Sequence, residues 1–198
     1  HSIKIFKGSE QNVFERVYNC CKKYKAKAFA RITSDNLFLD PIFLKKACKE
    51  FQNNKKIDYL SSLTMDYSPK WNLKSDYNIG SSIEILRFNI MRRVKPLVNN
   101  SNCEYPTWLI FSQPNLFKLK KFKLINEYSN FKVKKYRTTL DTALDLKFFR
   151  IISKKLNLIP GKNNFLEILK NERFIKLSKI NINTRMKLAQ DVIKKKNY

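Results

Sequence analysis

Apolar residues along the chain alternate between short continuous runs and runs spaced three or four positions apart, a pattern typical of strands alternating with helices. It predicts strands over 3–6, 28–33, 59–63, 82–86, 117–125 and 136–140. It predicts helices over 9–24, 40–51, 89–98 and 144–156, a helix starting at 104–106, and two short helices within 165–193. This order predicts an α/β fold with a largely parallel sheet.

Two local signals sharpen this prediction. Asp40 followed by Pro41 is a strong helix start, because the carboxylate accepts free backbone amides and proline fits the first turn. Ser9 is the predicted cap of the first helix. The polar segment 64–79 predicts a loop, of the kind that often carries a substrate.

Length and composition predict one domain over 1–198, with 165–198 as a C-terminal helical extension. The 198 residues are 43% hydrophobic and 13% aromatic, enough for one sizeable core. The four cysteines lack the paired spacing of zinc or thioredoxin sites, so we expect a reduced, cytoplasmic protein. No apolar run approaches the ~20 residues that span a bilayer, so no membrane partner is expected.

The net charge of +25 raises the question of a nucleic-acid partner. Basic residues are scattered as doublets, which predicts a solvated surface and no nucleic-acid partner. The doublets are Lys22 and Lys23, Lys45 and Lys46, Lys55 and Lys56, Lys120 and Lys121, Lys134 and Lys135, and Lys154 and Lys155. A basic domain that binds RNA or another polyanion remains an alternative.

Two carboxylates follow predicted strands about a hundred residues apart. Asp35 stands in ARITSDNLFLDP, and Asp141 stands in RTTLDTALDL. Ligands of open α/β sheets bind outside the carboxyl ends of strands. Two acidic groups meeting there would form an oxygen-only site suited to Mg²⁺ and a triphosphate. The alternative is that each aspartate only caps the helix that follows it.

The first of these segments belongs to a longer stretch that resembles a known family. IKIFKGSEQNVFERVYNCCKKYKAKAFARITSDNLFLDPIFL is similar to the middle of the cytidylyltransferases that activate acidic sugars, including acylneuraminate and Kdo cytidylyltransferases. The branch named for spore-coat polysaccharide biosynthesis is the most similar. DYLSS, YNIGSSIEI, CEYPTWLIF and YRTTLDTALDLKFFRII follow in the order and spacing of that branch's motifs.

The resemblance implies a three-layer, mostly parallel sheet of the nucleotide-diphospho-sugar transferase (Rossmann-like) type. It implies transfer of CMP from CTP to a sugar acid with pyrophosphate release, for polysaccharide or glycan synthesis. Asp35 and Asp141 would be the catalytic pair that holds Mg²⁺. The implied substrate-binding residues are Arg31, Gly80, Ser82, Glu84, Glu104 and Arg137. The family also suggests a homodimer.

Each substrate-binding residue has a plainer interpretation. Arg31 and Arg137 each precede an aspartate by four residues, so each could be that aspartate's salt-bridge partner. Gly80 suits a loop turn, Ser82 and Glu84 suit exposed strand positions, and Glu104 suits a helix start.

The chain also departs from the family pattern. Nothing matches the family's first strand and Gly- and Arg-rich phosphate loop, and there are three glycines in all, so we expect a piece of a longer protein that lacks the first strand. Open sheet edges would then favour self-association. Ser34, Ser82, Cys103 and Tyr105 replace family residues, and DTALDL lacks a proline and a glutamate. His1 is the sole histidine in the sequence, which argues against acid-base catalysis by a histidine side chain. A non-catalytic family member acting as a binding module is therefore a second hypothesis.

Overall fold

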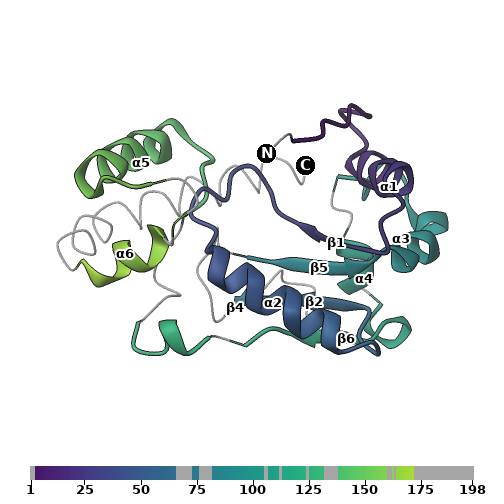
Figure 1. Ribbon diagram of the computed structural model, residues 1–198. Helices are drawn as coiled ribbons and strands as arrows, with labels where there is room; N and C mark the ends of the chain where they lie inside the picture. Colours follow the sequence, from purple (N-terminus) through teal and green to yellow (C-terminus); the bar gives the residue numbers. More distant parts are fainter. Residues whose placement is uncertain are drawn as a thin grey trace.

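A four-stranded sheet lies between two groups of helices, giving three layers (Figure 1). The computed structural model describes residues 3–65, 73–75, 82–104, 107–111, 113–123, 125–131, 138–159, 162 and 164–171. The predicted α/β class is confirmed. In the described part of the chain, no helix combines the length and apolar character needed to cross a membrane.

The strands of the central sheet follow the order β1-β5-β2-β6. Their bounds are β1 Ala28–Arg31, β2 Tyr59–Ser61, β5 Glu84–Arg87 and β6 Leu119–Lys121. β2 and β6 pair in parallel, whereas β5 is antiparallel to both β1 and β2. Three strands therefore share one direction and β5 runs against them. The carboxyl ends of β1, β2 and β6 consequently lie at the same edge of the sheet.

A small second sheet occupies part of the segment predicted as a loop. β3 (Leu63–Met65) and β4 (Leu73–Ser75) form an antiparallel pair. The loop prediction over 64–79 was therefore wrong at these two strands. Strands of three residues are too short for periodicity to reveal them, and pairing with each other is what defines them.

α2 (Pro41–Asn53) covers one face of the central sheet, and α5 (Ala143–Leu156) and α6 (Asn164–Lys170) join the same core cluster beyond the end of the sheet (Figure 1). Leu60 and Ile85 supply the sheet's part of this core. The helices contribute buried aromatic and aliphatic side chains, among them Phe43, Ala47, Phe51, Phe148, Phe149, Ile152, Phe165, Ile168 and Leu169. α6 therefore shares the core of α2 and α5.

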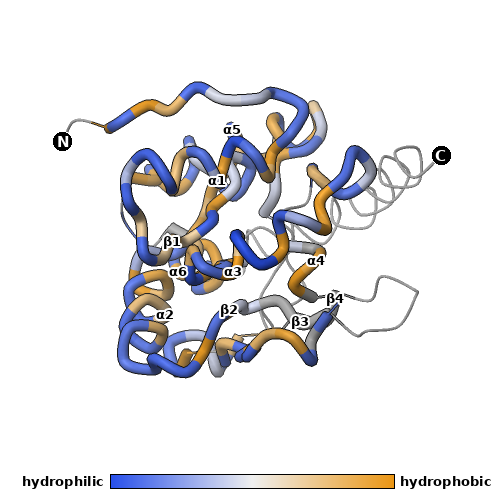
Figure 2. Tube along the Cα trace, turned by 90° about the vertical axis from the view of Figure 1, so that its right-hand side faces the viewer, coloured by the Kyte–Doolittle hydropathy of each residue, from blue (hydrophilic) through white to orange (hydrophobic). Residues whose placement is uncertain are grey.

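The other face packs against α1 (Val13–Lys23), α3 (Phe88–Val94) and α4 (Trp108–Phe111). Tyr59 and Leu86 face this second core from the sheet. Figure 2 shows α4 as an apolar stretch, while α1 alternates polar and apolar residues. Three short 3-10 helices complete the described elements: η1 (Lys95–Leu97), η2 (Pro114–Leu116) and η3 (Asn126–Tyr128).

The starts of three helices show which local sequence signals were sufficient to predict where a helix begins. Asp40 caps α2, and its carboxylate accepts the Ile42 N–H at 2.8 Å, as predicted. α1 instead begins after Asn12, while Ser9 accepts the Asn12 N–H at 2.9 Å, so the predicted cap was three residues early. α5 begins with a capping box formed by Thr142 and Asp145. Residues 3–6 form no strand, contrary to the prediction.

Candidate functional site

The loop that follows β1 lies directly beside the segment that precedes α5. Asn36 and Thr139 form an isolated antiparallel bridge, and the Leu140 N–H donates to the Asp35 carbonyl at 3.0 Å. Bridge partners have Cα atoms about 4.5–5.5 Å apart. Two segments a hundred residues apart in sequence therefore meet at the carboxyl end of β1. We call residues 33–36 with 139–141 the acidic junction.

Asp35 brings an unusual carboxylate to the acidic junction. The residue is half-buried, and its Oδ1 is buried without a hydrogen-bond partner. Its carbonyl is fully used, because it accepts N–H groups from both Leu37 and Leu140. A buried carboxylate oxygen without a partner is costly, since it has lost its water. Such an atom is suited to receive a cation or a hydrogen-bond donor from a ligand.

Asp141 is exposed and does not cap α5. Thr142 is the cap, and its hydroxyl accepts the Asp145 N–H at 3.2 Å. The Asp141 N–H donates to the Asp145 carboxylate at 2.9 Å, which fixes its backbone. Because Asp40 caps α2, Asp35 does not cap a helix either. The capping interpretation was therefore wrong for both aspartates.

The acidic junction fits a metal that takes few protein ligands. Within the described ranges, no group of three or more His, Cys, Asp and Glu side chains could hold a metal ion. Mg²⁺ commonly binds one or two carboxylates and completes its shell with water and substrate phosphates. Asp35, with its unpartnered oxygen, and the neighbouring Asp141 match that ligand chemistry.

A buried polar network crosses the sheet beside the acidic junction. The Arg31 guanidinium contacts the Glu84 carboxylate at 2.8 Å, and the Tyr59 hydroxyl donates to the other Glu84 oxygen at 2.6 Å. The Arg31 and Glu84 side chains are 24% and 8% exposed. The strand register explains the pair, because Arg31 lies opposite Glu84 in the β1-β5 ladder. Arg31 therefore pairs with Glu84, and the predicted partnership with Asp35 was wrong.

Tyr59 is the member of this network that sequence reasoning missed. Its full burial raises its pKa well above the ordinary value, and the negative charge of Glu84 raises that pKa further. The phenol therefore keeps its proton and holds the Glu84 carboxylate in place. The sequence did hold one signal for this role. Tyr59 lies in a predicted buried strand, and a buried tyrosine hydroxyl needs a hydrogen-bond acceptor.

The other predicted substrate-binding residues are placed as follows. Glu84 is buried, so its interpretation as an exposed strand residue was wrong. Ser82 is half-buried just before β5, and Glu104 is exposed. Cys103 is 8% exposed, and its carbonyl accepts the Phe14 N–H at 2.9 Å. Gly80 and Arg137 lie outside the described residues.

Comparison with known proteins gives two sequence relatives. An uncharacterised protein of Methanocaldococcus jannaschii is 29% identical over 192 residues, which cover 96% of this chain and 72% of the relative. The spore coat polysaccharide biosynthesis protein SpsF of Bacillus subtilis is 23% identical over 161 residues, which cover 80% of this chain and 60% of SpsF. No model of a protein family matches the chain.

A solved structure shares the fold. A cytidylyltransferase from Leptospira borgpetersenii superposes with a TM-score of 0.69 at 19% identity, over 86% of this chain and 67% of that chain. At this identity the likeness shows the fold. Together with the similarity to SpsF, it confirms the resemblance to the cytidylyltransferase family that the motifs indicated.

Proposed function

We propose that this chain acts as a nucleotidyltransferase that transfers CMP from CTP to a sugar acid and releases pyrophosphate. The observation that carries the proposal is the acidic junction, where Asp35 and the segment ending at Asp141 meet at the carboxyl end of β1. Its support is the shared fold with a cytidylyltransferase and the sequence similarity to SpsF.

Asp35 and Asp141 would hold Mg²⁺ in this proposal. When bound, the ion supplies positive charge that neutralises the phosphates and orients them. Asp35 contributes a buried oxygen that no protein donor competes for. Asp141 stands on a backbone fixed by Asp145. The chain's own task is positioning, which together with electrostatics provides most of the rate in phosphoryl and nucleotidyl transfer.

Arg31 acts as a fixed positive charge near the reacting groups. Glu84 holds the guanidinium, and Tyr59 holds Glu84, so the orientation of Arg31 is set before substrate arrives. A partly exposed guanidinium held in this way can bind an anionic group of the nucleotide or of the sugar acid. We assign Arg31 to substrate binding, with Glu84 and Tyr59 as its positioning residues.

A non-catalytic binding module is the second candidate, and one observation favours it. Cys103 occupies the position of the family's arginine, and it is buried against α1 and α3. A thiol in a core cannot bind a phosphate or a carboxylate. This position therefore serves the core and the backbone contacts of α1 in this chain, and it offers no charge to a substrate.

The test measures pyrophosphate release by the natural full-length protein with CTP, Mg²⁺ and a panel of sugar acids. Asp35→Asn and Asp141→Asn should each lower turnover by at least about 100-fold, because each removes a metal ligand. Glu167→Gln is the matched control, since it neutralises an exposed carboxylate on α6. It should leave turnover unchanged.

Thermal unfolding with CTP and Mg²⁺, read together with pyrophosphate release, separates the two candidates. Both candidates predict a higher Tm in the presence of CTP and Mg²⁺ if the nucleotide binds the folded protein, as linkage requires. Nucleotide binding without pyrophosphate release for any sugar acid would support the binding module. Full turnover by Asp35→Asn would overturn the proposed role of the acidic junction.

A further inference from the structure

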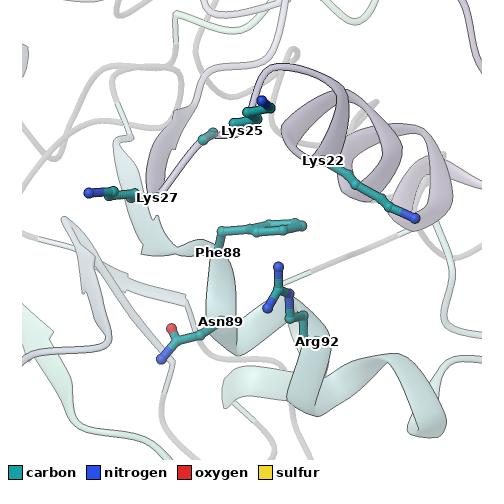
Figure 3. Close-up of a pocket in the computed structure, with 7 residues that line it drawn as sticks. Lys22, Lys25, Lys27, Phe88, Asn89 and Arg92 are labelled. Carbon is teal, nitrogen blue, oxygen red and sulfur yellow. The ribbon is translucent and has the colours of Figure 1, made fainter.

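A basic pocket lies at the end of the β1-β5 ladder that is remote from the acidic junction. Its volume is about 390 Å³, and Figure 3 shows the residues that surround it. Lys27 directly precedes β1 and Phe88 directly follows β5, and their backbones are joined by a 2.9 Å hydrogen bond. Arg31 and Glu84 mark the opposite end of the same ladder. The lining residues are Lys22, Lys25, Ala26, Lys27, Phe88, Asn89 and Arg92.

Within the part of the chain that the structure describes, no carboxylate neutralises this pocket. Four of its lining residues are cations, and none is acidic. Among the described residues, none of these four cations forms an ion pair. Mutual repulsion of four like charges around one hollow is unfavourable, and a bound anion would relieve it.

A second pocket shows what a neutralised basic surface looks like in the same chain. It has a volume of about 460 Å³ and is also rich in lysine, with Lys46, Lys120, Lys121 and Lys123 in its lining. Here Lys120 pairs with Glu50 at 2.8 Å, and Lys46 pairs with Glu127. We call this the paired pocket. Abundant lysine alone therefore does not explain the unpaired charges of the basic pocket.

The turn that carries Lys25 is held in a fixed geometry. The Ala26 N–H donates to the Cys21 carbonyl at 2.9 Å, and the Lys25 N–H donates to the Lys22 carbonyl at 3.1 Å. These two bonds are the Schellman ending of a helix, in which the residue after the cap usually is glycine. Lys25 occupies that position with φ of 52°. The chain thus keeps a lysine where backbone geometry favours glycine.

The floor of the pocket is rigid. The Phe88 side chain is 6% exposed, and its ring contacts Tyr18 with centroids 5.2 Å apart. The Arg92 guanidinium lies 5.2 Å from the centre of the Phe88 ring, a cation–π arrangement that orients it. Figure 3 shows Lys22 and Lys25 on the α1 side of this ring and Arg92 on the α3 side.

We propose that the basic pocket binds a compact, multiply charged phosphate anion. Lysine and arginine residues from α1, the following turn, α3 and the position just before β1 line one hollow, which suits a small anion better than an extended chain. A polyanion such as RNA favours a continuous basic stripe, because it makes successive phosphate contacts along its length. The pocket is separate from the acidic junction, so this proposal does not depend on the proposed reaction.

The test is titration calorimetry of the full chain with inorganic pyrophosphate, in EDTA to exclude divalent cations. Lys22→Gln/Lys27→Gln removes two unpaired charges. We expect about fivefold weaker binding for each lost charge, or about 25-fold together, as for a unit charge ~4 Å from an anion in water. The matched control is Lys46→Gln/Lys120→Gln, which removes two charges of the paired pocket. It should change the affinity less than about twofold, because carboxylates already neutralise those charges.

Lys25→Gly separates charge from folding. It removes one cation and also gives the turn the residue that its backbone favours. We expect about fivefold weaker pyrophosphate binding together with a higher Tm of the free protein. If the substitution instead disturbed folding, the Tm of the variant would be lower than that of the parent.

Three outcomes would overturn the proposal. Equal weakening by the two double variants would assign binding to the overall charge of +25. Absence of pyrophosphate binding by the parent chain would remove the site. Binding of a single-stranded RNA oligonucleotide, with a steep salt dependence and without measurable pyrophosphate affinity, would identify an extended polyanion surface instead.

Discussion

The two ends of β1 carry charge in opposite ways. At the carboxyl end, Arg31 is bound to Glu84, and Glu84 is bound to Tyr59 inside the sheet. At the other end, Lys27 and its cationic neighbours are exposed around a pocket and have no acidic partner among the described residues. Charge at the first end is paired and largely buried, whereas charge at the second end is basic and open to solvent.

The difference follows from the cost of removing a charge from water. A buried carboxylate is costly without close partners, and Glu84 has two of them. Exposed ammonium groups keep their water and need no partner, so they are available to a ligand. Charge at the buried end therefore contributes to folding and to the orientation of Arg31, and charge at the open end is free for recognition.

Removing Glu84 should give the largest effect on stability. Glu84→Ala leaves the Tyr59 hydroxyl and the Arg31 guanidinium without their acceptor, at a cost of about 3 kcal/mol. Lys27→Ala, at the open end of the same ladder, should cost less than about 0.5 kcal/mol. Urea unfolding measures both. Equal losses would contradict the contrast between the two ends.

Alkaline pH should weaken the buried end next. The pKa of Tyr59 is raised by burial, so the folded state keeps a proton that the unfolded state loses. This stabilisation is fully present below pH 10 and is lost as pH rises towards the folded pKa, by about 1.4 kcal/mol for each pH unit above 10. Burial also raises the pKa of Cys21 to about 11, so the decline should begin near pH 9. Urea unfolding from pH 8 to 11 follows it.

Tyr59→Phe is the control for the alkaline loss. The variant should be less stable at neutral pH, because Glu84 loses one donor, but its stability should fall less between pH 10 and 11. An unchanged slope would assign the alkaline loss to other groups, with Cys21→Ala as the next variant to examine.

Asp35→Asn should have a smaller effect, and of the opposite sign. The variant replaces a charged group whose Oδ1 is buried without a partner by a neutral one, which lowers the desolvation cost. We expect the free energy of unfolding to rise by about 1 kcal/mol or to stay unchanged. Calorimetric melting measures it. A clear loss of stability would show that the Asp35 carboxylate serves the fold.

Lys25→Gly should give the smallest gain, about 0.5 kcal/mol. The left-handed conformation costs a residue with a Cβ ~1–2 kcal/mol, and the greater entropy of unfolded glycine offsets part of that gain. Asn157, at φ of 46°, ends α5 in a similar conformation that asparagine tolerates better. Asn157→Gly should therefore stabilise the protein less than Lys25→Gly does in the same urea series.

Local signals were enough where neighbours in sequence form the structure. Asp40 followed by Pro41 predicted the start of α2, because the cap and the first turn are made by adjacent residues. The spacing of Phe148, Phe149 and Ile152 predicted α5 for the same reason. The motifs also indicated the family, and they proposed Asp35 and Asp141 as the acidic residues of the candidate site, which stays a prediction.

Tertiary structure alone decided which distant residues pair with each other. Arg31 could have paired with Asp35 by sequence, but the register of β1 and β5 places it opposite Glu84. Likewise, the bridge between Asn36 and Thr139 joins segments that no local pattern connects. Spacing along a chain determines which side chains share a face, whereas contacts between distant segments depend on strand order and register. The sequence by itself thus proposed the two acidic residues, and the fold decided that their segments meet and that the cations at the far end have no ion-pair partner among the described residues.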